Sequence, residues 1–129
     1  MSRAPSRILV VDDELDTAQS LAVLFRAMGK QVEFAVNAKA ALDIAQRLEP
    51  EMVFVDIGLP DIDGWELAKR LQAQAAAKAG KRALRVVVIT GRAGDEERQR
   101  SEAVGAEAHL VKPVDPAYIE KLVTSTKSS

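Results

Sequence analysis

The sequence predicts an α/β fold in which helices cover both faces of a parallel β-sheet. Five short apolar segments, most of them rich in Val, Ile or Phe, alternate along the 129 residues with five segments whose apolar residues recur at helical spacing. Strands that are buried on both faces of a parallel sheet are apolar throughout, and most of these segments have that composition. The expected strands cover residues 8–11, 31–36, 52–56, 84–89 and 109–111.

Residues that favour helix ends delimit the expected helices. Gly29 suits the left-handed conformation that follows a helix, and Asn37 can accept a hydrogen bond from the first turn of the next one. Asp63 followed by Glu66 has the spacing of a capping box. Asp115 can cap the last helix, which has a proline at its first position. The helices are expected over about residues 15–28, 38–48, 64–79, 95–104 and 116–123.

Length and composition indicate one globular domain. We expect it to cover residues 1–129, with a core at about 7–123 and polar tails at 1–6 and 124–129. The net charge of −1 gives no electrostatic reason to expect binding to nucleic acid or to an anionic membrane, and the absence of cysteine excludes thiolate metal sites. No apolar run approaches the roughly 20 residues of a membrane helix. No signal peptide is evident, so a cytoplasmic location is expected.

Polar residues stand at the carboxyl ends of four expected strands. Asp12 and Asp13 follow the first strand, Asp56 ends the third, Thr90 follows the fourth and Lys112 follows the fifth. Because parallel strands end at the same edge of a sheet, these side chains are expected to converge there. Three neighbouring carboxylates cannot all remain ionised without a counter-charge. Mg²⁺, which prefers oxygen ligands, would supply that charge.

The same residue types suit the transfer of a phosphoryl group. Asp56, at the end of the strand expected in the centre of the sheet, could act as a nucleophile and form an aspartyl phosphate. The hydroxyl of Thr90 and the ammonium of Lys112 could stabilise the oxygens of the transferred group. The alternative for Asp56 is a loop aspartate that follows a strand and has no chemical role.

Several short motifs, taken together, carry a resemblance to a known family. They are Asp12-Asp13, Asp56 with Pro60 and Asp63-Gly64, Thr90-Gly91, and Lys112-Pro113. With them, the chain resembles the receiver domain of two-component response regulators, the CheY-like superfamily, over about residues 7–123. The resemblance implies a flavodoxin-like, doubly wound sheet of five parallel strands in the order 2-1-3-4-5, with five helices.

The resemblance also implies a phosphoacceptor and a metal site. Asp56 would accept phosphate from a phosphohistidine of a histidine kinase or a histidine phosphotransfer protein. Asp13, Asp56 and the backbone carbonyl of Gly58 would bind Mg²⁺, or Mn²⁺ in its place, and Asp12 would act mainly through water. Such a domain assists its own phosphorylation and dephosphorylation without being a conventional turnover enzyme.

In the family, phosphorylation is reported to partners by a threonine and an aromatic ring. Thr90 and Lys112 would contact the phosphoryl group, and the peptide bond between Lys112 and Pro113 would be cis. The ring three residues before the lysine moves inward as the threonine moves, which changes the surface around the fourth helix, fifth strand and fifth helix. This chain has His109 where the family usually has Tyr or Phe. Both a switch role and a packing role for His109 stay open.

Two other functions fit parts of the sequence. Residues 61–64, Asp-Ile-Asp-Gly, have the form used by phosphatases of the haloacid dehalogenase type, but they begin five residues after Asp56 and no inserted cap is evident. An interaction domain that does not use phosphate is the other possibility, and the complete set of acids, Thr90 and Lys112 argues against it. The cognate kinase, the output and the oligomeric state are not predicted. Both a single-domain regulator and a receiver of a hybrid sensor kinase fit the sequence.

Overall fold

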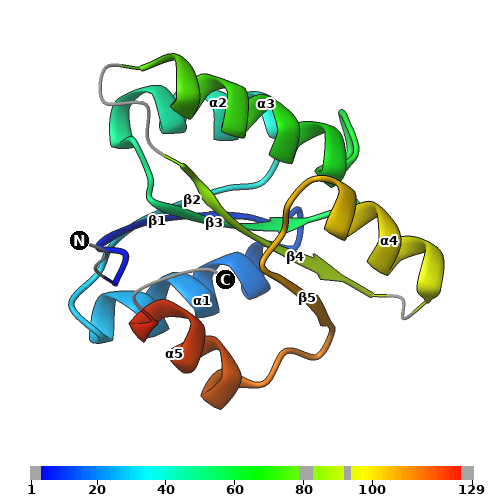
Figure 1. Ribbon diagram of the computed structural model, residues 1–129. Helices are drawn as coiled ribbons and strands as arrows, with labels where there is room; N and C mark the ends of the chain where they lie inside the picture. Colours follow the sequence, from blue (N-terminus) through cyan, green and yellow to red (C-terminus); the bar gives the residue numbers. More distant parts are fainter. Residues whose placement is uncertain (1–3, 79–82, 92–93, 126–129) are drawn as a thin grey trace.

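A five-stranded parallel sheet forms the centre of the computed structural model, which describes residues 4–78, 83–91 and 94–125. The strand order is β2-β1-β3-β4-β5, and every neighbouring pair is parallel, so the expected topology is confirmed (Figure 1). The expected polar tails lie partly outside the described residues. The strands are β1 (Arg7–Val11), β2 (Gln31–Ala35), β3 (Met52–Asp56), β4 (Arg85–Thr90) and β5 (Ala108–Val111).

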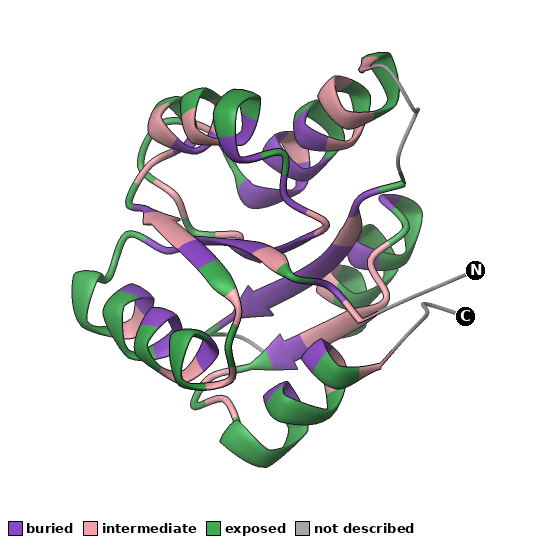
Figure 2. Cartoon of the chain, turned by 90° about the vertical axis from the view of Figure 1, so that its left-hand side faces the viewer, coloured by how far each residue is buried: buried purple, intermediate pink, exposed green. Residues whose placement is uncertain are grey.

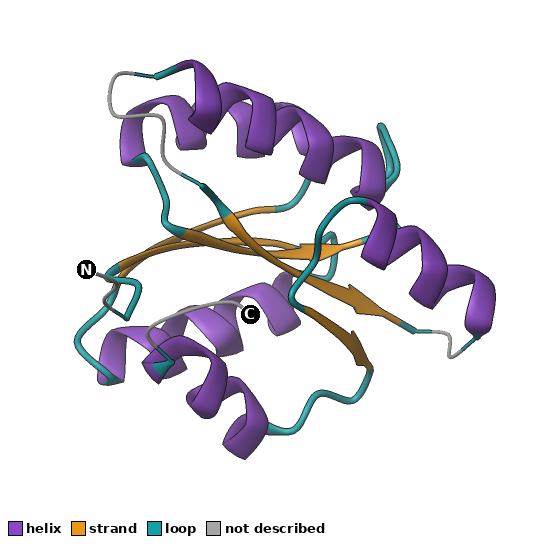
Figure 3. Ribbon diagram, viewed as in Figure 1, coloured by secondary structure: helices purple, strands orange, loops and turns teal. Residues whose placement is uncertain are grey.

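Helices cover both faces of the sheet. Figure 3 shows α2, α3 and α4 on one face and α1 and α5 on the other. None of the described helices is both long enough and apolar enough to cross a bilayer. The helices are α1 (Leu15–Ala27), α2 (Ala38–Leu48), α3 (Gly64–Ala77), α4 (Asp95–Ala103) and α5 (Pro116–Thr124).

The core consists of two apolar clusters, one on each face of the sheet. Figure 2 shows that buried residues lie along the strands and on parts of the helices on both sides of the sheet. Successive residues of a strand point to opposite faces, so Val53 and Val55 pack beneath α2 and α3 whereas Phe54 packs beneath α1. The rings of Phe25 and Phe54 lie 5.0 Å apart between their centroids. All five residues of β3 are buried, as a central strand of a doubly wound sheet requires.

Capping residues begin and end the helices largely where the sequence predicts. The side chain of Asn37 accepts a hydrogen bond from Ala40 N–H, and that of Asp63 accepts one from Glu66 N–H. Asp115 caps α5 in the same way. Gly29 follows α1 with a φ of 81°, a left-handed conformation that favours glycine. These contacts satisfy backbone donors that the helices leave unpaired.

Two apolar residues differ from their expected burial. Helical periodicity places Leu15 and Tyr118 on the buried stripes of α1 and α5, but they are 49% and 45% exposed. Both lie in the first turn of their helix, and burial begins further on, at Ala18 and Ile119. Periodicity therefore identifies the inward face of a helix but not the point along the helix at which that face meets the sheet.

Candidate functional site

Three carboxylates converge at the carboxyl ends of β1 and β3. These strands are neighbours, with Val11 opposite Val55, so the residues that follow them lie side by side. Asp12, Asp13 and Asp56 each place an oxygen within 4.8 Å of the others. Asp12 is fully buried, Asp56 is 6% exposed, and Asp13 faces solvent. The expected acidic cluster is therefore present, with one side open to a ligand from solution.

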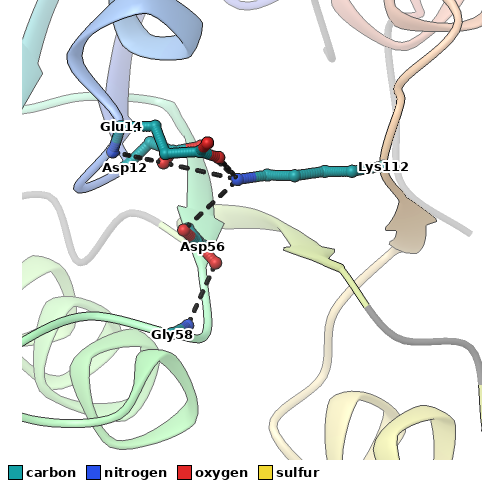
Figure 4. Close-up of polar contacts among 5 residues, drawn as sticks. All are labelled: Asp12, Glu14, Asp56, Gly58 and Lys112. Carbon is teal, nitrogen blue, oxygen red and sulfur yellow. Dashed lines mark hydrogen bonds and ion pairs between the residues drawn. The ribbon is translucent and has the colours of Figure 1, made fainter.

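The ammonium of Lys112 lies among these carboxylates. Its Nζ is 3.1 Å from Asp12 Oδ2, 3.5 Å from Asp56 Oδ2 and 2.6 Å from Glu14 Oε1, so it carries the positive charge that faces the acidic group (Figure 4). The contact with Asp12 Oδ2 is an ion pair without hydrogen-bond geometry, since that oxygen has no hydrogen-bond partner among the described residues. Asp12 Oδ1 accepts hydrogen bonds from Glu14 N–H at 2.9 Å and from Lys112 at 3.4 Å.

The electrostatics of the cluster follow from burial and like charge. The pKa of Asp12 is raised to about 6, mainly by burial and also by the charge of Asp56, while a hydrogen bond from Glu14 N–H and the ammonium of Lys112 oppose the rise. Burial and then the charge of Asp56 also raise the pKa of Asp13. Burial alone would lower the pKa of Lys112, but the contacts with Glu14, Asp12 and Asp56 outweigh it and raise that pKa. The ionised forms of Asp12 and Asp13 are therefore disfavoured despite the nearby ammonium, and a further cation would stabilise them.

The end of β4 brings Thr90 to the same edge of the sheet. Thr90 is 1% exposed and directly follows Ile89, the residue paired with Asp56 across the two strands. Lys112 N–H donates to the backbone carbonyl of Thr90 at 2.8 Å, which fixes the chain after β5 against the end of β4. The peptide bond between Lys112 and Pro113 is cis. Every residue that the sequence assigns to phosphoryl chemistry thus lies at this edge.

The loop after β3 is held closely against the acceptor strand. Gly58 N–H donates to Asp56 Oδ1 at 3.0 Å, and Gly64 N–H donates to the Ile57 carbonyl at 3.0 Å. A Cβ on Gly64 would lie 2.5 Å from Ile57 Cα and 2.6 Å from the Asp56 carbonyl oxygen, so no larger residue fits there without a backbone shift. The start of α3 is therefore packed directly against the backbone of Asp56.

The comparisons with known proteins agree with this geometry. The sequence profile of the response regulator receiver domain matches residues 8–124. The chain belongs to this family. Sporulation initiation phosphotransferase F of Bacillus subtilis is 33% identical over 109 residues, which are 84% of this chain and 83% of that protein. Response regulator Rre1 of Synechocystis sp. is 32% identical over 92% of this chain, which spans only 50% of that relative.

Solved structures show the same fold. Chemotaxis protein CheY4 of Vibrio cholerae has a TM-score of 0.83 and 27% identity, and the match covers 96% of this chain and 100% of that one. A CheY-like receiver domain protein from Methanospirillum hungatei has a TM-score of 0.79 and 28% identity, over 90% of this chain and 88% of that one. The flavodoxin-like CheY fold is therefore confirmed.

His109 of this receiver domain lies on β5 opposite Val88 and faces α4. Its Nδ1 is 2.7 Å from the hydroxyl oxygen of Ser101, and its Nε2 is buried with no hydrogen-bond partner among the described residues. Burial lowers the pKa of His109, the charge of Arg98 lowers it further, and Glu97 opposes both. The neutral imidazole is therefore the form that this packing favours.

Sequence reasoning missed one contributor to the site and one contact of the loop beside it. Glu14 is one of the three carboxylates on Lys112, although 98 residues separate the two in sequence. Asp61 accepts hydrogen bonds from Ala38 N–H at 2.9 Å and Lys39 N–H at 3.1 Å, so it caps α2 from the loop after β3. Glu14 directly follows Asp12-Asp13, and this was the available signal for the first contact. No signal existed for the second, because it joins the loop after β3 to the first turn of α2, far away in the sequence.

Proposed function

We propose that Asp56 accepts a phosphoryl group from a phosphohistidine on a histidine kinase or histidine phosphotransfer protein. The convergence of Asp12, Asp13, Asp56 and Lys112 at one sheet edge carries the proposal. In the transfer, a carboxylate oxygen of Asp56 forms a bond to phosphorus as the phosphorus–nitrogen bond breaks. The bonding electrons stay with the imidazole nitrogen of the donor, and a proton from solvent neutralises it.

The acidic cluster fits a divalent cation. Asp12 Oδ2 is buried without a hydrogen-bond partner among the described residues, and burial, together with the charge of Asp56, raises the pKa values of Asp12 and Asp13. Oxygen donors of this kind suit Mg²⁺, or Mn²⁺ in its place. Asp13, Asp56 and the Gly58 carbonyl would hold the ion, with Asp12 acting through water. When bound, the ion supplies positive charge that offsets the negative charge of the phosphoryl oxygens and the carboxylates.

Lys112 and Thr90 complete the proposed mechanism. The ammonium of Lys112 already lies 3.5 Å from Asp56 Oδ2, close enough to turn to a phosphoryl oxygen on that side chain. The side chain of Glu14 is exposed, and its Oε1 lies 2.6 Å from the same ammonium. An ion pair with an exposed partner is weak, so Lys112 can exchange this contact for one with a phosphoryl oxygen. The Thr90 hydroxyl would bind another phosphoryl oxygen. Thr90 and His109 would then report phosphorylation to the surface formed by α4, β5 and α5.

The chain would act as a signalling module in the cytoplasm and not as a conventional turnover enzyme. The chain spans 83% of one relative and 50% of another. Both a single-domain regulator and the receiver of a hybrid sensor kinase are compatible with these lengths. The phosphatase alternative is less well supported, because both carboxylates of its motif cap helices. Asp61 caps α2 and Asp63 caps α3. An interaction domain that does not use phosphate would have no need for buried carboxylates grouped around the ammonium of Lys112.

The first test is phosphorylation by a small donor. Incubation with Mg²⁺ and acetyl phosphate or phosphoramidate should add one phosphoryl group, detected as a mass increase of the intact protein. Asp56→Asn should abolish the increase, because an amide is not a nucleophile. Asp61→Asn is the matched control in the same loop and should leave it unchanged. Labelling that survives Asp56→Asn, or that is lost only in Asp61→Asn, would refute the proposal.

The second test is metal binding. Asp13→Ala should weaken Mg²⁺ binding by at least about tenfold, as loss of a supporting or direct ligand does. Without metal, the same change should leave stability unchanged or raise it, because it removes repulsion within the cluster. Binding can be followed by the amide chemical shifts of residues 56–58 during Mg²⁺ titration. Asp16→Ala, an exposed acid nearby on α1, is the control; equal affinities in both variants would remove Asp13 from the site.

A further inference from the structure

A single buried hydroxyl joins three elements of the molecule. Ser101 is 1% exposed and is the one buried residue of α4, all of whose residues the structure describes. Its Oγ accepts a hydrogen bond from Trp65 Nε1 at 3.2 Å, lies 3.0 Å from the Glu97 carbonyl and lies 2.7 Å from His109 Nδ1. Ser101 therefore connects α3 and β5 through α4.

Counting protons at this hydroxyl assigns the tautomer of His109. Trp65 Nε1 can only donate and the Glu97 carbonyl can only accept, so the single hydroxyl proton of Ser101 goes either to Glu97 or to His109. If it goes to Glu97, the neutral ring of His109 carries its proton on Nδ1 and donates that proton to the Ser101 oxygen. Nε2 then carries only a lone pair, and no N–H is left without a partner. If it goes to His109, Nε2 carries a buried N–H without a partner. An orphaned buried donor is the costlier arrangement, so the first one is favoured.

The same bridge begins next to the proposed phosphoacceptor. Gly64 packs against the backbone of Asp56 and Ile57 with no space for a Cβ, and Trp65 is the next residue. A displacement of the loop after β3 would therefore move Trp65 and, through its indole N–H, the hydroxyl of Ser101. The guanidinium of Arg100 lies over the Trp65 ring at 3.9 Å from its centroid, so a second contact ties α4 to the same residue.

We propose that Ser101 is a positioning residue that holds His109, protonated on Nδ1, against α4 and links it to Trp65 at the start of α3. The link to signalling rests on the proposed function, because it requires that phosphorylation of Asp56 displace the adjacent loop. The bridge itself does not depend on phosphorylation. It is a property of the unmodified chain and is tested there first.

The charges around His109 define how the bridge responds to pH. Glu97, Arg98 and Glu102 face this region from α4, and Glu107 faces it from the segment before β5. Glu107 is already bound by Arg85 of β4 at 2.7 Å, and Glu97 is offset by Arg98. A second proton on His109 would stand on the buried Nε2, with no partner there among the described residues. The protonated ring should therefore leave its position, which weakens its contact with Ser101.

The tautomer can be measured without ambiguity, because the chain contains one histidine and one tryptophan. Long-range proton–nitrogen correlation spectra at pH 8 should show a protonated Nδ1 and an unprotonated Nε2 for His109. The opposite tautomer, which is the preferred one for histidine in water, would overturn the proposal. Below the pKa of His109, the Trp65 indole N–H signal should shift together with the ring signals; an indole signal that does not follow the titration would also overturn it.

Variants of Ser101 separate a positioning role from packing alone. Ser101→Ala should shift the Trp65 indole N–H upfield, accelerate its exchange with solvent and return His109 to the tautomer preferred in water. Ser101→Thr keeps the hydroxyl and should retain the wild-type tautomer and indole signal. If Ser101→Ala keeps both wild-type signatures, the bridge does not exist; should that variant fail to fold, the wild-type tautomer and the threonine variant still decide the matter.

A third measurement tests the link to Asp56. With Mg²⁺ and phosphoramidate, the His109 and Trp65 signals of the wild type should shift, and Ser101→Ala should be phosphorylated equally while its His109 signal moves less. A wild type that is phosphorylated without any change at His109 or Trp65 would refute the link. A wild type that accepts no phosphoryl group would refute the proposed function instead, and the bridge would still be decided by the tautomer in the unmodified protein.

Discussion

Helices α1 and α4 cover opposite faces of the same sheet but are attached to it in different ways. Helix α1 buries Ala18, Leu21, Ala22 and Phe25, whereas α4 buries only Ser101 among its fully described residues. The free energy gained by burying apolar surface is roughly proportional to the buried area and does not depend on orientation. The strength of a hydrogen bond, in contrast, depends on the distance and angle between its donor and acceptor. Helix α1 is therefore part of the permanent core, and α4 is held in a position that a small change in geometry can alter.

The buried contacts that residues 95–103 of α4 make with neighbouring elements are polar, and an apolar side chain, Val104, joins the core only directly after the helix. Ser101 bonds to Trp65 and lies against His109, and Arg100 stacks on the Trp65 ring and lies 3.9 Å from Asp63. At the end of the helix, Gln72 Nε2 donates to the Val104 carbonyl at 2.8 Å. Each such interaction contributes little net stability compared with a buried aromatic side chain. A helix attached in this way is suited to report a local event, because moving it disturbs little of the core.

The largest effect that this comparison predicts is at Phe25. Phe25→Ala should lower the free energy of unfolding by about 3–5 kcal/mol, through lost burial, a residual cavity and loss of the ring contact with Phe54. Urea denaturation measures the change. Val23→Ala on the same helix is the matched control: Val23 is 64% exposed, so its truncation should change stability by less than about 0.5 kcal/mol. Similar losses in both variants would mean that α1 is not anchored by its buried face.

The strand pattern of the sequence predicts the fold because the buried strands have a simple composition. Met52 to Val55 are apolar and Asp56 ends the run, so strand position and the functional edge follow from the same few residues. Boundaries are less predictable: β4 extends to Thr90, one residue beyond its apolar run, because backbone pairing with β5 continues to Val111. Backbone hydrogen bonds between strands do not depend on side chains and leave no trace in composition.

A smaller effect is predicted for α4. Ser101→Ala should cost about 1–3 kcal/mol, because Trp65 Nε1 and His109 Nδ1 lose a partner in a buried place. Native-state hydrogen exchange should show α4 amides exchanging through local opening well below the global unfolding free energy, with α1 amides close to it. Ser101→Ala should lower protection in α4 more than in α1. Uniform protection across both helices would contradict the distinction between them.

The site was predictable only where sequence neighbours or strand ends define it. Asp12, Asp13 and Asp56 could be placed together because parallel strands end at one edge. The contact of Ser101 with His109 and Trp65 could not, because it depends on the distance and rotation of α4 relative to β5. Trp65 is 8% exposed and packs in the core, and its indole N–H also donates to Ser101. Which side chains of two different elements meet depends on how those elements pack. A single sequence contains no pattern from which that packing can be predicted.

The smallest predicted effect concerns pH, and it distinguishes the polar attachment of α4 from the apolar attachment of α1. Burial, and then the charge of Arg98, lowers the pKa of His109 below its usual value of 6.5. The stability that comes from keeping His109 neutral is therefore complete above pH 6.5 and is lost as the pH falls from there through the lowered value. Because the ring is only partly buried, solvent screening keeps the effect small.

Urea denaturation of wild type and His109→Tyr at several pH values between 5 and 8, without metal, measures this contribution. A variant is needed because Asp12 acts in the opposite direction: its pKa is raised to about 6, so its protonation stabilises the fold as the pH falls through that value. Subtracting the two profiles cancels the contribution of Asp12 and isolates that of His109. Relative to the variant, the wild type should lose stability below pH 6.5, and hydrogen-exchange protection should fall in α4 while that of α1 stays constant. Parallel profiles would show that His109 titrates alike in the folded and unfolded chains, and that its contact with Ser101 does not depend on the charge of the ring.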